Sequence, residues 1–142
     1  MIILQANKFF YEKGGSERYF FALSRALEAR GHRVVPFAMR HPRNLPSDCS
    51  RYFVAQRDYD AAGATPASLS AALGFVRSPA AARSIRELVD DTTPDVAHLH
   101  NIYHQMTPSI IDALANRGVP VVMTLHDYKL ACPSYAMFAK GA

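Results

Sequence analysis

The feature that most restricts the fold is a strand, a diglycine turn, a helix and a second strand, in that order, within residues 2–37. Residues 2–4 are a short β-prone run, and residues 16–30 repeat apolar side chains at helical spacing. Residues 33–37 form a second β-prone run. A strand–helix–strand unit of this kind joins two parallel strands by a right-handed crossover. The pattern therefore predicts a parallel α/β domain.

The predicted helix has recognisable ends and one apolar face. Phe20, Leu23 and Leu27 share a face at helical spacing. Ser16 is expected to be the N-cap, because its hydroxyl can accept a hydrogen bond from a free N–H of the first turn. Gly31 is expected to end the helix in a left-handed turn, which glycine adopts without steric cost.

The same order of elements recurs near the other end of the sequence. Residues 95–100 predict a strand, Thr107–Pro108 predicts the cap and first residue of a helix, and residues 119–125 predict a continuous apolar strand. Continuous apolar strands are typical of parallel sheets covered on both faces. Alternating strands and helices predict a doubly wound α/β fold, with a mostly parallel sheet and helices on both faces.

The middle of the sequence is less regular. Residues 41–50 predict a loop and residues 52–54 a short strand. Two cap-and-proline pairs predict helices over residues 66–76 and 79–91. Because no linker or low-complexity segment interrupts the pattern, residues 1–142 are expected to form one domain.

Composition narrows the class of protein. Sixteen Lys and Arg against twelve Asp and Glu give a net charge of +4. This excess suits phosphorylated ligands, lipid head groups or nucleic acid, and equally a solvated basic face. Cys49 and Cys132 make neither a disulfide framework nor a zinc motif, which is typical of a reducing cytoplasm. The first apolar run is too short for a signal peptide, and none is long enough to span a membrane, so we expect at most peripheral membrane contact.

Polar clusters follow three predicted strands, at the strand ends where parallel α/β sheets bind ligands. The first contains Gly14 and Gly15 at the start of a helix. Free N–H groups and the helix dipole favour a phosphate or carboxylate there, although two glycines also suffice for a turn. The pair is not a GxGxxG motif, and Arg40 rather than an acidic residue follows the second strand, so an NAD-type fold is disfavoured.

Histidines dominate the other two clusters. His126 ends the last predicted strand beside Asp127, where an imidazole can donate to an oxyanion, orient a hydroxyl, act as acid or base, or serve only the structure. His98, His100 and His104 raise the alternative of a metal-dependent hydrolase. That cluster has no carboxylate, which disfavours the metal. We expect His98 to be hydrogen-bonded in the core and His100 to face a cleft.

Three segments together resemble the family 4 glycosyltransferases, which are retaining enzymes of the GT-B fold. Residues 8–18 (KFFYEKGGSER) resemble the first loop of that family. Residues 94–101 (PDVAHLHN) are similar to its PDvvHxHn strand, and residues 121–128 (VVMTLHDY), followed by Cys132–Pro133, to its vvxTlHDy…CP segment. The resemblance extends over nearly the whole sequence, and the three segments occur in the family's order.

The resemblance implies that residues 1–142 are the acceptor-side, N-terminal Rossmann-like domain of a two-domain enzyme, incomplete at its end and without the nucleotide-sugar domain. It implies that Gly14 and Gly15 bind the donor diphosphate or sugar and that His126 is catalytic. The remaining residues that it assigns to substrate binding are His100, Asn101 and Asp127.

The resemblance also implies partners and a location. The expected substrates are a nucleotide sugar, held through the second domain, and a glycan or lipid-linked acceptor, as in polysaccharide biosynthesis. No cofactor, metal or nucleic acid is implied. We expect a cytoplasmic protein, with the inner face of the membrane as the place of any peripheral contact. The alternative function is that of a non-catalytic α/β binding domain or a remnant, and the isolated fragment is expected to be inactive.

Overall fold

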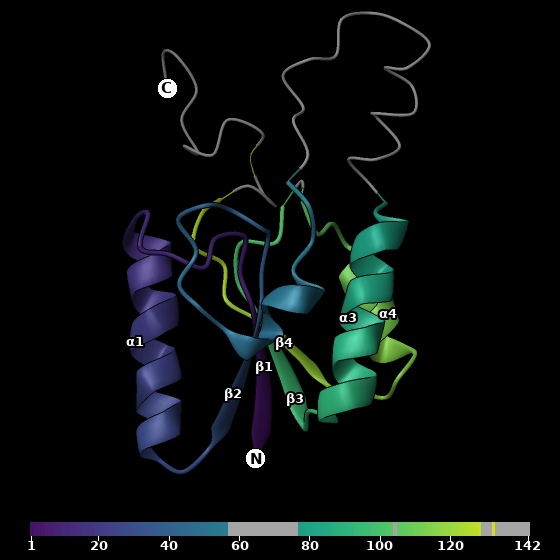
Figure 1. Cartoon of the computed structure of the whole chain (residues 1–142), viewed down its shortest axis with the longest axis horizontal. Coiled ribbons are helices and arrows are strands. Elements are labelled where there is room, and N and C mark those ends of the chain that lie inside the picture. The colour runs from purple at the N-terminus through teal and green to yellow at the C-terminus, as the bar shows by residue number, and fades with distance from the viewer. Residues whose placement is uncertain (57–76, 104, 129–131, 133–142) are drawn as a thin grey trace, which may run out of the picture.

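Four parallel strands form one sheet with helices on both of its faces, as the computed structural model shows (Figure 1). The structure describes residues 1–56, 77–103, 105–128 and 132. The strands occur in the order β2-β1-β3-β4 across the sheet; in chain order they are β1 (Ile2–Ala6), β2 (Arg33–Phe37), β3 (Val96–Leu99) and β4 (Val121–Met123). The predicted doubly wound α/β fold is confirmed.

The main core lies between the sheet and a pair of helices, α3 (Pro79–Thr92) and α4 (Ser109–Ala115). Leu4 sits between Val35 of β2 and Ala97 of β3 in the parallel register, and all three side chains are buried. The helices contribute the apolar side chains of Ile85, Leu88, Ile110 and Leu114, which are fully buried. Burial of each such side chain contributes about 1.5–3 kcal/mol.

Helix α1 (Gly15–Ala29) covers the opposite face of the sheet (Figure 1). Its N-cap is Gly14, which has an extended backbone, and no side chain caps the helix. The prediction that Ser16 is the N-cap is therefore wrong, because Gly15 is already helical and places Ser16 in the first turn. The predicted stop is confirmed: Gly31 has a φ of 80°, and its N–H donates to the carbonyl of Glu28.

Aromatic side chains anchor the N-terminal half of α1. Phe20 and Phe21 are buried, and their rings contact each other and Phe10 with centroids 5.1–6.2 Å apart. Farther along the helix, Leu23 and Leu27 are only partly buried. The end of α1 that follows the diglycine is thus its better packed end.

Helix α3 has the predicted start, with the Ser78 hydroxyl accepting a hydrogen bond from the N–H of Ala81. The other predicted helix of this region, over residues 66–76, lies outside the described residues. Helix α4 begins one residue later than predicted, at Ser109, because Thr107 has a left-handed backbone. The Thr107 hydroxyl still accepts a hydrogen bond from the N–H of Ser109.

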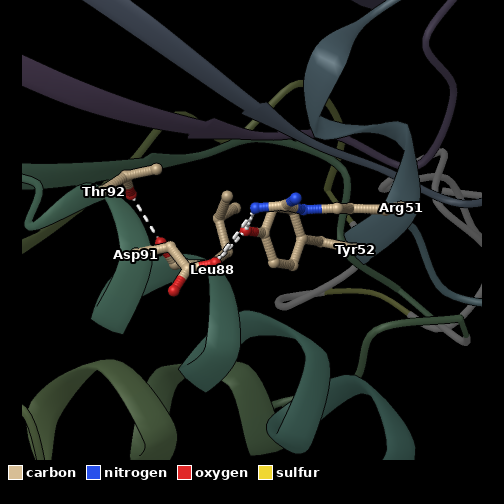
Figure 2. Close-up of polar contacts among 5 residues, drawn as sticks. All are labelled: Arg51, Tyr52, Leu88, Asp91 and Thr92. Atoms are coloured by element: carbon tan, nitrogen blue, oxygen red, sulfur yellow. Dashed lines mark hydrogen bonds and ion pairs between the residues drawn. The ribbon is translucent and has the colours of Figure 1, made fainter.

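The predicted strand over residues 52–54 is wrong. A 3-10 helix, η1 (Asp48–Tyr52), occupies part of it, and only a single bridge joins Val54 to Met39. The reason is a contact with a distant helix, shown in Figure 2. Arg51 lies 3.1 Å from a carboxylate oxygen of Asp91 in α3, and the Tyr52 hydroxyl donates to the same oxygen.

The last strand is shorter than the apolar run of residues 119–125 and is not covered on both faces. Val122, in the middle of β4, is 54% exposed. Among the described strands β4 lies at the edge of the sheet, so it has a hydrogen-bonded neighbour on one side only. Neither Cys49 nor Cys132, both within the described residues, forms a disulfide. None of the helices in the described ranges is long and apolar enough to cross a membrane.

Candidate functional site

The diglycine and His126 lie at the same edge of the sheet. Because all four strands are parallel, their carboxyl ends share one edge, and α1 begins there (Figure 1). Tyr19 joins the two elements: it lies four residues after Gly15 in α1, and its ring centroid is 5.4 Å from that of His126. The structure thus brings together two of the sequence-predicted site elements, which are far apart along the chain.

Asn7 connects three segments of the chain at this same end of the sheet, where the strands have their carboxyl ends. This side chain follows β1 and is fully buried. Its amide nitrogen donates to Glu17 in α1 at 3.3 Å, and its oxygen accepts from the backbone N–H of Asn101 at 3.3 Å. The Lys8 N–H in turn donates to the carbonyl of Asn101 at 2.9 Å. Asn101 is therefore held at the site by its backbone, and its side chain is partly exposed.

Two histidines form a direct contact at the centre of the site. Nδ1 of His100 lies 3.0 Å from Nε2 of His126. The expectation that His100 faces a cleft is wrong: its side chain is fully buried, with the rings of Tyr19 and Phe20 packed against it at 6.0 and 5.3 Å. The reason is α1, whose aromatic side chains close over the end of β3. His126 itself is partly exposed.

His98 lies beside this pair. Its Nε2 is 2.7 Å from the hydroxyl of Thr124, which confirms the expected hydrogen bond, and its ring is 4.3 Å from that of His100. Burial lowers the pKa of His98, and burial together with the nearby His98 and His126 lowers the pKa of His100 to about 3. Both imidazoles are therefore neutral at pH 7, and His126 packs against uncharged neighbours.

The glycines are exposed and do not serve close packing. A Cβ added at Gly15 would meet nothing within 4 Å, and one at Gly14 would lie 3.6 Å from a carboxylate oxygen of Glu17. Lys13 precedes them, with its ammonium 4.1 Å from the ring of Phe9. The helix N-terminus is therefore open to a ligand, beside one exposed lysine and one largely buried internal carboxylate.

Asn7, Tyr19 and Thr124 are site residues that sequence reasoning missed. Asn7 had one local signal, a polar side chain at the carboxyl end of a predicted strand. The proposed metal site gains no support: no group of three His, Cys, Asp or Glu side chains within residues 1–56, 77–103, 105–128 and 132 is arranged to hold a metal ion. His104, the third histidine of that hypothesis, lies outside the described residues. Asp127 lies beside His126 and is partly exposed.

The comparison with family sequence models agrees with the resemblance of the three motifs. The sequence model described as Glycosyltransferase Family 4 matches residues 13–139. A comparison with curated proteins gives no match. Among solved structures, the crystal structure of SsfS6, a glycosyltransferase from Streptomyces sp. SF2575, is similar over 95% of this chain with 18% sequence identity and a TM-score of 0.49. The matched part is 41% of the SsfS6 chain, so the present sequence spans less than half of that protein.

Proposed function

The chain belongs to Glycosyltransferase Family 4, and from this premise we propose that it is the acceptor-side domain of a retaining glycosyltransferase. The donor is a nucleotide sugar, held mainly by a second domain that faces this one. The acceptor is a glycan or a lipid-linked saccharide, reached in the cytoplasm or at the inner face of the membrane. The observation that carries the proposal is the convergence of Gly14–Gly15 and His126 at one edge of the sheet, joined by Tyr19.

The diglycine end of α1 suits the leaving group. In the transfer, the oxygen of an acceptor hydroxyl forms a bond to the anomeric carbon, the bond from that carbon to the nucleoside diphosphate breaks, and the hydroxyl proton passes to the departing diphosphate. Negative charge then grows on the diphosphate, and free N–H groups at a helix N-terminus stabilise such charge. Lys13, exposed beside the diglycine, adds positive potential, whereas Arg18 is paired with Glu12 at 3.9 Å. Because Gly15 has no side chain and nothing lies within 4 Å of where a Cβ would be, a phosphate can approach the backbone there.

His126 suits the reacting centre. It is partly exposed, it follows the last residue of β4 by three positions, and its ring centroid is 5.4 Å from that of Tyr19. From this place an imidazole can donate a hydrogen bond to a sugar or phosphate oxygen as charge develops. Asn101 and Asp127, partly exposed on the neighbouring loops, contribute polar contacts to the substrates.

The test is a transfer assay on residues 1–142 joined to the nucleotide-sugar domain of a family member, with a panel of labelled nucleotide sugars and lipid-linked or glycan acceptors. His126→Ala should lower turnover by about 10²-fold or more, because positioned donors and acid–base groups contribute 10²–10⁴-fold. His32→Ala is the matched control, since His32 is also partly exposed but lies beyond the far end of α1. Near-wild-type turnover in His126→Ala, with a native circular dichroism spectrum, would refute the catalytic role.

A further inference from the structure

The buried contact between His100 and His126 assigns His100 a role that its position in a motif does not reveal. We propose that His100 is a positioning residue, which donates its Nδ1–H to Nε2 of His126 and so fixes the proton of neutral His126 on Nδ1. This inference rests on the proposed function of His126 at the transfer site. It also specifies which ring nitrogen of His126 contacts the substrate and whether that nitrogen carries a proton.

The geometry leaves only one ring nitrogen of His126 for a ligand. Nε2 lies 3.0 Å from Nδ1 of His100 and is occupied by that hydrogen bond, so Nδ1 is the nitrogen that remains. Two neutral rings joined in this way have two arrangements. Either His100 donates and both rings carry their proton on Nδ1, or His126 donates and both carry it on Nε2. Whichever ring donates, His100 and His126 therefore carry their protons on the same ring nitrogen, either Nδ1 in both or Nε2 in both.

Burial selects between these arrangements. Nε2 of His100 is buried and has no hydrogen-bond partner among the described residues. If His126 were the donor, this buried nitrogen would carry an N–H without an acceptor, and buried N–H groups without a partner are rare in proteins. If His100 is the donor, the same nitrogen holds only a lone pair. The second arrangement avoids the orphaned N–H.

Packing keeps the His100 ring in place and uncharged. Phe20 lies edge-to-face against it at 5.3 Å, and His98 lies 4.3 Å away on the same strand. The titratable groups that face it are His98, His126 and the Tyr19 ring. Because its pKa is about 3, His100 keeps a single ring proton from pH 5 upward. Such a fixed, neutral partner determines the tautomer of His126, because the hydrogen bond made by one ring nitrogen sets which nitrogen carries the proton.

The consequence is a hydrogen-bond donor at the reacting centre. A His126 ring protonated on Nδ1 presents an N–H to the oxygen atoms of a diphosphate or sugar, which accept hydrogen bonds. It cannot remove a proton through that nitrogen without first losing its own. His126 is thereby a hydrogen-bond donor to developing charge rather than a general base.

The tautomers can be read by long-range ¹⁵N–¹H NMR of the ¹⁵N-histidine-labelled 142-residue chain, without substrate. In the wild type, His100 and His126 should both show a protonated Nδ1 and an unprotonated Nε2 at pH 8. His100→Leu should release His126 to the mixture of tautomers of an exposed imidazole, in which Nε2–H dominates. His100→Asn, whose amide can donate from the position of Nδ1, should restore the Nδ1–H form of His126. Thr124→Val, which removes only the partner of His98, should leave His126 unchanged.

Nε2–H signals for both rings in the wild type would overturn the proposal, as would an unchanged His126 spectrum in His100→Leu. The wild-type spectrum decides even if His100→Leu does not fold. Because no substrate is present, this result is separate from that of the transfer assay. An Nδ1–H tautomer in a protein whose His126→Ala variant is fully active would contradict the proposed function and leave the role of His100 in positioning intact.

Discussion

The side-chain oxygen of Asn7 accepts a hydrogen bond from the backbone N–H of Asn101, a residue 94 positions later in the chain. The same fully buried carboxamide donates to Glu17 in α1 and to the carbonyl of Phe9. One residue thus joins the end of β1, the start of α1 and the loop after β3. These are the segments that bring the diglycine and the histidines to the same end of the sheet.

Asn7→Ala should lower the free energy of unfolding by about 1–3 kcal/mol, because it leaves buried polar partners without their hydrogen bonds. Urea unfolding monitored by circular dichroism measures this. Asn116→Ala is the control: Asn116 is an exposed residue at the end of α4, and its change should stay within about 0.5 kcal/mol. Equal effects of the two substitutions would show that the Asn7 contacts do not hold the edge together.

The two ends of α1 should respond oppositely to alanine. Gly15→Ala fits the space available and removes chain freedom, so stability should stay constant or rise by up to about 1 kcal/mol. Transfer by the two-domain enzyme should nevertheless fall, because the new Cβ obstructs a phosphate. Gly31→Ala should cost about 1–2 kcal/mol, because its φ is 80°. Its transfer rate per folded molecule should not change. Loss of stability without loss of activity in Gly15→Ala would contradict the proposed role of the diglycine.

Stability should decline in mild acid, in part through His100. Its pKa in the folded protein is about 3, below the ordinary 6.5, so the unfolded chain binds a proton that the folded chain does not. The free energy of unfolding therefore decreases as the pH falls from about 6.5, by up to about 1.4 kcal/mol per pH unit for each such group. His98, with a lowered pKa, acts in the same direction.

His100→Asn removes one of these groups and should give a shallower loss of stability between pH 7 and pH 5 than the wild type. Urea titrations at several pH values measure the difference in the free energy of unfolding between the two proteins. The contributions of the other titrating groups largely cancel in this difference. Parallel curves for the two proteins would indicate that His100 is not buried in its neutral form.

The isolated chain should bind nucleotide sugars weakly, because the proposed function places most donor contacts in a second domain. Isothermal titration calorimetry on the 142 residues should give no micromolar affinity, and no transfer should be measured. Micromolar binding of a nucleotide sugar by this chain alone would contradict the proposal that a second domain makes most of the donor contacts.

Sequence reasoning succeeded where local patterns determine structure. The apolar period of residues 16–30, the left-handed turn at Gly31 and the cap at Ser78 all depend on neighbours in sequence. It failed where distant contacts decide. The segment around Tyr52 forms a 3-10 helix because its side chains bind Asp91 in α3, 39 positions away, and no periodicity in residues 52–54 contains that information.

Some features of the candidate site could likewise be predicted from the sequence, and others could not. That Gly14–Gly15 and His126 share an edge follows from parallel topology, which the alternation of strands and helices predicts. The burial of His100 does not follow from the topology, because it depends on how Phe20 and Tyr19 of α1 pack over β3. Whether a polar side chain at a strand end faces a ligand or a neighbour is a property of tertiary packing.

The uneven packing of α1 has a dynamic consequence. Amide protons near Leu27 should exchange with solvent well before those near Phe20, because the aromatic rings secure only the latter end. Fraying of this helix therefore proceeds from the end remote from Gly14–Gly15. The diglycine turn keeps its shape while the rest of the helix opens and closes.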